Sequence, residues 1–214
     1  MFRTSIRRAA PPLGTALALT LLIVALIPRT APIAAARRPM ASAMAMTTPF
    51  DQQFIDMMAP HHQSAVAMAQ VALTRARHPQ IKSLARSIIA DQDSEIAQMK
   101  AWRKAWYGSS ATPSMANMPM LPGLKTGMSG MTMMHDIATL KTATPFDKAF
   151  IDAMLPHHQL ALDAATLELA RGSHPRLKAL ALSIIKGQSR EEGLMQAYRA
   201  LWYGSAGMGH MGGM

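Results

Sequence analysis

Residues 49–65 read PFDQQFIDMMAPHHQSA and residues 145–161 read PFDKAFIDAMLPHHQLA, so one segment occurs twice, 96 positions apart. The match continues without a gap to residues 106–109 and 202–205, which both read WYGS, and roughly half of the aligned residues are identical. A self-similarity of this length indicates two copies of one structural unit. The fold of the chain is therefore decided by what one copy forms.

Each copy predicts two helices joined at a proline. In the first copy, helical periodicity runs from about Asp51 to about Thr74, and it resumes after His78-Pro79 because proline is favoured in a first helical turn. Gly108 is typical of a helix end. One helical hairpin buries too little surface to be stable, so we expect an all-α, ferritin-like four-helix bundle built from two duplicated helical hairpins.

Polar residues interrupt the apolar face of each hairpin at its middle. His61 and His62 share an inward arc with Phe54 and Met58, and a hairpin folded about residue 78 is expected to bring His61 to Glu95. Gln92 and Gln188 belong to the same layer. The candidate metal ligands in the bundle are Met58, His61, His62, Glu95 and Met99, with Met154, His157, His158, Glu191 and Met195 in the second copy.

The residue types of this layer select a class of metal. The chain has no cysteine, which excludes zinc ribbons and iron-sulfur clusters. Neutral imidazole binds late transition metals, thioether selects Cu(I) or Ag(I), and the lack of a dense carboxylate cluster argues against magnesium or calcium. Copper is therefore the predicted metal, with Cu(I) preferred and Cu(II) also accepted. The alternative is a buried hydrogen-bond network that only specifies the bundle.

Methionine is abundant outside the predicted helices as well, at 20 residues in the whole chain. Residues 110–143 are rich in Met, Gly and Pro, and we interpret them as a linker without helical periodicity or a core of its own. Closely spaced thioethers can hold Cu(I) without a folded scaffold, although a flexible low-complexity segment is the alternative. The candidate ligands here are Met115, Met118, Met120, Met131, Met133, Met134 and His135, and in the C-terminal tail Met208, His210, Met211 and Met214.

The N-terminus has the order of a secretory signal. A basic start precedes an apolar run from Leu13 to Ile27 and a small-residue stretch at residues 34–36. Residues 1–36 are thus predicted to be a signal peptide, with an uncleaved membrane anchor as the alternative, and the protein is expected to be exported to the periplasm or another extracytoplasmic space. The remaining predicted parts are a Met/Ala-rich flexible segment at 37–46, hairpins at 47–109 and 144–205, the linker at 110–143 and a Gly/Met/His tail at 206–214.

The chain is basic, with a formal net charge of +10. Four of the arginines fall within the predicted signal, and the other basic residues are scattered without interleaved aromatics, which argues against nucleic-acid binding. Peripheral contact with an anionic membrane surface explains this charge better than nucleic-acid binding does. Copper ions and other exported copper-handling proteins are the expected partners.

Two motifs resemble a known family. The pattern Phe-x-x-x-Met-x-x-His-His-x-x-Ala, from Phe54 to Ala65, is followed by Gln-x-x-Glu-x-x-x-Met, from Gln92 to Met99. Both are similar to domain-of-unknown-function family 305, which includes the CopM-type periplasmic copper-binding proteins. The resemblance implies a ferritin-like fold, export, and copper binding through Met and His in copper homeostasis or resistance.

Three functions follow for testing. The leading hypothesis is a non-enzymatic exported protein that sequesters or transfers copper. A ferritin-like dinuclear metal oxidase is the second, although the Glu-x-x-His pattern of such enzymes is missing. A metal-free helical module for interactions in the cell envelope is the third.

Overall fold

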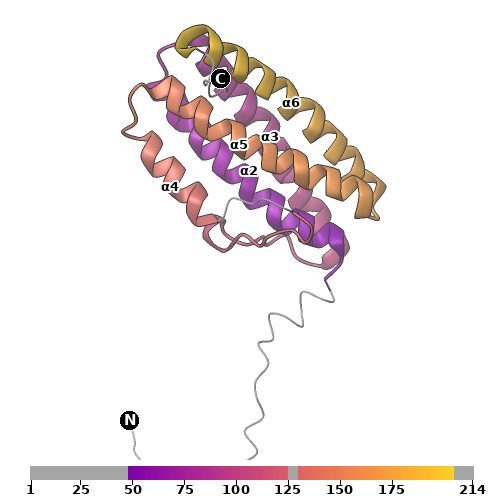
Figure 1. Ribbon diagram of the computed structural model, residues 1–214. Helices are drawn as coiled ribbons and strands as arrows, with labels where there is room; N and C mark the ends of the chain where they lie inside the picture. Colours follow the sequence, from indigo (N-terminus) through magenta and orange to yellow (C-terminus); the bar gives the residue numbers. More distant parts are fainter. Residues whose placement is uncertain (1–47, 125–129, 205–214) are drawn as a thin grey trace, which may run out of the picture. The chain divides into compact units, whose positions relative to one another are not determined.

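The structure is a computed structural model that describes residues 48–124 and 130–204. Within these residues the elements are α2 (Phe50–Arg75), α3 (Pro79–Tyr107), the short 3₁₀ helix η1 (Met115–Asn117), α4 (Gly130–Leu140), α5 (Phe146–Arg171) and α6 (Pro175–Tyr203), with no strand among them. Figure 1 shows α2, α3, α5 and α6 running side by side as a bundle. The predicted all-α bundle of two helical hairpins is confirmed.

The helix ends follow the local sequence signals. His78 and His174 are the N-cap residues of α3 and α6, and a proline occupies the first turn of each helix. At the other end of α3, Gly108 adopts φ 81°, in the left-handed region that residues with a Cβ avoid. The first helix continues through Pro60, which lies directly before the His pair.

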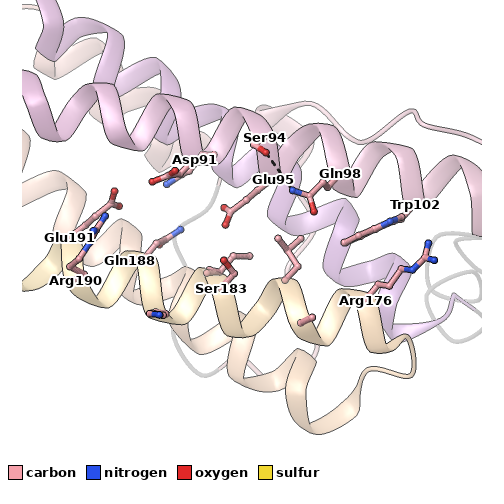
Figure 2. Close-up of a pocket in the computed structure, with 16 residues that line it drawn as sticks. Asp91, Ser94, Glu95, Gln98, Trp102, Arg176, Ser183, Gln188, Arg190 and Glu191 are labelled. Carbon is pink, nitrogen blue, oxygen red and sulfur yellow. Dashed lines mark hydrogen bonds between the residues drawn. The ribbon is translucent and has the colours of Figure 1, made fainter.

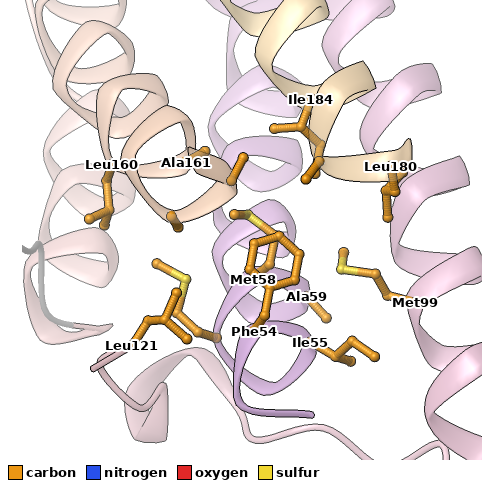
Figure 3. Packing of buried hydrophobic residues seen from close by; sticks show 14 of the residues in the cluster. Phe54, Ile55, Met58, Ala59, Met99, Leu121, Leu160, Ala161, Leu180 and Ile184 are labelled. Carbon is orange, nitrogen blue, oxygen red and sulfur yellow. The ribbon is translucent and has the colours of Figure 1, made fainter. Parts of the chain in front are cut away.

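The bundle has two apolar cores with the His layer between them. The helices of each hairpin pack on each other, and α2 packs on α5, whereas α3 and α6 touch at few positions. One core joins the start of α2 to the middle of α5, as seen for Phe54, Met58 and Leu160 in Figure 3. The other joins the end of α2 to the start of α5 and includes Ala65 and Phe150. The His pairs therefore interrupt one hydrophobic interior at mid-height.

The region between the hairpins differs from the prediction. We expected residues 110–143 to lack helical structure and a core, but they contain α4, which packs along α2 and α5 on the side away from α6 (Figure 1). Met133 and Leu140 of α4 are 0% and 2% exposed, and Met118 and Leu121 are also buried. These apolar side chains extend the two cores, so burial already accounts for part of the methionine content.

The two hairpins are tied together at both ends by an aspartate. Asp147, at the start of α5, accepts hydrogen bonds from the backbone N–H groups of Arg77 and His78 and from His78 Nδ1, the last at 2.6 Å. Asp51 in α2 accepts from the backbone N–H groups of Ser173 and His174 and from the Ser173 hydroxyl, in the turn before α6. Each aspartate thus caps the opposite hairpin. Spacing within one repeat does not reveal a partner from the other repeat.

Aromatic stacking reinforces the same two junctions. The His78 ring lies 3.7 Å from the Trp202 ring and nearly parallel to it, and His174 stacks on Trp106 at 3.8 Å. His78 and His174 thus link the two repeats through ring stacking.

No helix in the described part of the chain is both long and apolar enough to cross a membrane. The predicted signal peptide or anchor, residues 1–36, lies outside that part.

Candidate metal centre

Four histidines form a row across the centre of the bundle. The rings of His61 and His157, from different repeats, have their centroids 3.8 Å apart. His62 continues the row beyond His61 at 6.0 Å, and His158 continues it beyond His157 at 6.3 Å. All four residues are 0% exposed. The adjacent helices α2 and α5 therefore place four imidazoles together, away from water.

A glutamate holds each outer ring. Because a carboxylate can only accept, Nε2 of His62 donates to Glu95 Oε2 at 2.8 Å, and His158 Nε2 donates to Glu191 Oε2 at the same distance. The predicted pairing of His61 with Glu95 is wrong by one residue. The hairpin register brings His62 to Glu95, which leaves His61 free to face the other repeat.

Every imidazole of the row has an Nδ1 atom without a hydrogen-bond partner. Nε2 of His61 is also unpartnered, as are the amide atoms of Gln92 and Gln188. For His61 and His157, burial first and the neighbouring imidazoles second hold the pKa well below its ordinary value. These two rings are therefore neutral near pH 7, which is the form that binds metals. Unpartnered buried nitrogen atoms are what a metal-binding site requires.

One hydroxyl makes the row unequal. Ser64 Oγ lies 2.6 Å from His157 Nε2, 2.7 Å from the carbonyl oxygen of His61 and 3.4 Å from Met133 Sδ. The second repeat has Leu160 at the equivalent position. Ser64 is not among the residues predicted for the site, although a serine in one repeat where the other has leucine was a usable signal.

A groove of about 660 Å³ lies between α3 and α6, on the side where the glutamates hold the outer rings. Its lining includes Gln92, Glu95, Gln188 and Glu191, and Figure 2 shows Glu95 and Gln188 reaching into it from facing helices. Both signs of charge line it, because Arg176, Lys186, Arg190 and Asp91 are present with the glutamates. The two carboxylates that hold the outer histidines thus also border an open space.

The predicted methionine ligands fall into three groups. Met58 and Met99 lie in one apolar core, Met154 and Met195 lie in the other, and all four are 0% exposed. Met133 is buried against Ser64, whereas Met120, Met134 and His135 are exposed and Met115 is half-buried. The remaining candidates, Met208, His210, Met211 and Met214 and the side chain of Met131, lie outside the described residues.

Carboxylates do not complete a metal site here. In residues 48–124 and 130–204, no group of three or more His, Asp and Glu side chains has the spacing of a metal site. Other donor types are present: the amide groups of Gln92 and Gln188 are buried and unpartnered, and the Met133 thioether contacts Ser64, which in turn contacts His157.

A second buried acidic group lies at one end of the bundle. Glu168 is 0% exposed, and burial, together with the neighbouring Asp51, raises its pKa to about 8. Burial alone would also raise the pKa of Asp51, but the Ser173 hydroxyl and two backbone amides hold it below its ordinary value. A Cβ at residue 172 would collide with the Glu168 carboxyl, so glycine at this position leaves room for the buried carboxyl. Glu168 and Gly172 have no counterparts in the first repeat, which has Ala72 and Ala76 at the equivalent positions.

The fold and the row define a class: an all-α protein of two hairpins that enclose paired histidines held by glutamate. Residues 51–199 match the family described as a domain of unknown function, DUF305, and the chain belongs to that family.

Solved structures of related proteins are similar over most of their length. CopM in the Cu(I)-bound form is 39% identical, with a TM-score of 0.59, over 72% of this chain and 98% of that one. CopM in the Cu(II)-bound form is 41% identical, with a TM-score of 0.60, over 72% and 97%. A putative secreted DUF305 protein from Streptomyces coelicolor is 25% identical, with a TM-score of 0.61, over 76% and 98%.

A curated relative matches over a shorter range. Uncharacterized protein L153 of Acanthamoeba polyphaga mimivirus is 39% identical over 51 residues, which are 24% of this chain. The match covers 34% of that relative, or about a third of its length.

Proposed function

We propose that this protein is an exported, non-enzymatic copper-binding protein that sequesters or transfers copper in copper homeostasis or resistance. Its ligands are histidines of the buried row and methionine thioethers, and Cu(I) is the preferred ion. The single observation that carries the proposal is the row of four buried imidazoles, each with an unpartnered Nδ1.

The arrangement around the outer rings fits metal binding. A carboxylate that accepts from one imidazole nitrogen fixes the tautomer and raises the basicity of the other nitrogen. Glu95 and Glu191 stand in that relation to His62 and His158. Nδ1 is then the ligating atom in both rings.

Thioethers supply the selectivity. Met58, Met99, Met154 and Met195 are buried in the apolar cores on either side of the row, and thioether is a soft donor that favours Cu(I). The Met-rich segments, including the C-terminal tail, would add further Cu(I) sites or pass ions to the bundle. The similarity to CopM, which has been solved in Cu(I)-, Cu(II)- and Ag-bound forms, supports the choice of copper.

The cellular setting is part of the proposal. The signal-like residues 1–36 and the similarity to a DUF305 protein described as secreted support export to an extracytoplasmic space. Partners there would be other exported copper-handling proteins, and the positive charge favours peripheral contact with anionic membranes.

The test is a Cu(I) titration of the full chain against a competing chelator. A variant with His61, His62, His157 and His158 replaced by Gln, compared at equal helical content by circular dichroism, should lose the tightest sites. A second variant with the exposed and tail methionines replaced by Leu should lose only weaker sites. Equal binding by the wild type and the His variant would refute a copper site in the row.

A further inference from the structure

The hydroxyl of Ser64 has one proton and three neighbours. The His61 carbonyl, three residues back in α2, is a strong acceptor at 2.7 Å, and this back-bond is common for serine in helices. The thioether of Met133, at 3.4 Å, is a weak acceptor. The hydroxyl proton therefore goes to the carbonyl, and the oxygen is left to accept from His157.

This assignment fixes the tautomer of His157. The nitrogen 2.6 Å from Ser64 Oγ is Nε2, so Nε2 carries the proton and donates it. The lone pair of the neutral ring is then on Nδ1, the atom that has no partner in the bundle. Ser64 and Met133 are both 0% exposed, so no water competes for the bond.

The matching ring of the first repeat has no such neighbour. The second repeat has Leu160, which cannot form a hydrogen bond, at the position of Ser64, and neither ring nitrogen of His61 has a hydrogen-bond partner. The two inner rings, 3.8 Å apart, are thus chemically different although the repeats that carry them are alike. The helix α4, which brings Met133 onto Ser64, also occurs once.

We infer that Ser64 is a positioning residue that presents Nδ1 of His157 to copper, so that the row has one preferred Cu(I) site on the His157 side rather than two equal sites. This inference rests on the proposed function. A pre-set tautomer and ring orientation reduces what the metal must reorganise, which typically changes metal affinity by about 10- to 100-fold.

The first experiment needs no copper. Long-range ¹H–¹⁵N spectra of imidazoles in the full-length protein distinguish a proton on Nε2 from one on Nδ1. The wild type and Ser64→Thr should show His157 protonated on Nε2, and Ser64→Ala should show a mixture of tautomers. A wild-type proton on Nδ1 would overturn the inference.

The second experiment is a stepwise Cu(I) titration of the same variants. We expect Ser64→Ala to weaken the first site about tenfold or more, Ser64→Thr to restore it, and Leu160→Ser to strengthen the second site. An unchanged first site in Ser64→Ala would overturn the positioning role. If the wild type binds no Cu(I) in the bundle, the proposed function fails, while the tautomer spectra still report whether Ser64 controls His157.

Discussion

At the residue scale, the glutamates beside the outer histidines combine two roles. Each accepts a hydrogen bond from a fully buried ring and also borders the groove between α3 and α6. The Glu95 side chain is 13% exposed, so its carboxylate retains some hydration. This position lets a charged group support a buried imidazole without itself being fully desolvated.

The first prediction concerns this support. Glu95→Ala leaves both nitrogens of His62 unpartnered and should lower the free energy of unfolding by about 1–3 kcal/mol, the usual cost of an unsatisfied buried donor. Glu95→Gln retains an acceptor oxygen and should lose less. Urea unfolding of the three proteins measures the difference, and an equal loss in both variants would show that the hydrogen bond is not the cause.

The second prediction concerns Glu168 and pH. Its folded pKa of about 8 lies above the ordinary 4.5, so the folded chain holds this proton more tightly than the unfolded chain does. Its contribution to stability is therefore fully present below pH 4.5 and is lost as the pH rises through 8. Asp51 raises the pKa of Glu168 and Lys178 lowers it, while Tyr107, whose own pKa is raised to about 12, lies near both carboxyls.

Glu168→Gln isolates that contribution, because the amide cannot titrate. The wild type should lose roughly 2–4 kcal/mol relative to the variant between pH 4.5 and pH 8.5. Unfolding free energies measured at both pH values give this difference of differences, from which other titrating groups cancel. A constant gap between the two proteins would contradict a buried neutral carboxyl.

At the element scale, α4 is a structural part of the bundle. It adds Met133 to one apolar core and Leu140 to the other. Its neighbour Met134 is 47% exposed. Adjacent methionines in one helix thus have opposite environments.

The third prediction uses that contrast. Met133→Ala should destabilise the protein by about 2–4 kcal/mol, because it creates a cavity in a packed core. Met134→Ala should change stability by less than about 0.5 kcal/mol. Thermal or urea unfolding tests the pair, and equal small effects would mean that α4 does not pack on the bundle.

The sequence predicted the long helices well because their signals are local. Pro79 and Gly108 mark a start and an end, and the duplication doubles every observation. The helix α4 was missed because its methionines resemble a flexible metal-binding segment, and only burial distinguishes the two. The partner of Glu95 was missed because a shift of one residue in register rotates the facing residue by 100°. The role of Ser64 could not be predicted because its partner, His157, belongs to the other repeat and is brought close only by the fold.

At the scale of the whole molecule, the repeats hold each other at both ends and enclose the His row between them. Asp147 receives two backbone N–H groups and a ring N–H from the first hairpin while it is 1% exposed. The stability of one hairpin therefore depends on the other.

The fourth prediction follows. Asp147→Ala should cost about 3 kcal/mol, since it leaves buried donors without an acceptor, and it should lower the stability of both hairpins together. Asp91→Ala, at an exposed position, is the control and should have little effect. Hydrogen exchange of amides in α2 and α6 measures the coupling, and loss confined to α5 and α6 would contradict it.

X-ray absorption at the copper K edge of the full chain loaded with one equivalent of Cu(I) tests the central claim most directly. If copper binds in the buried row, the spectrum should show nitrogen scatterers with the multiple-scattering pattern of imidazole. This pattern should disappear in the four-His variant. Sulfur scatterers alone, identical in both proteins, would contradict the account, because copper would then reside only in the methionine segments.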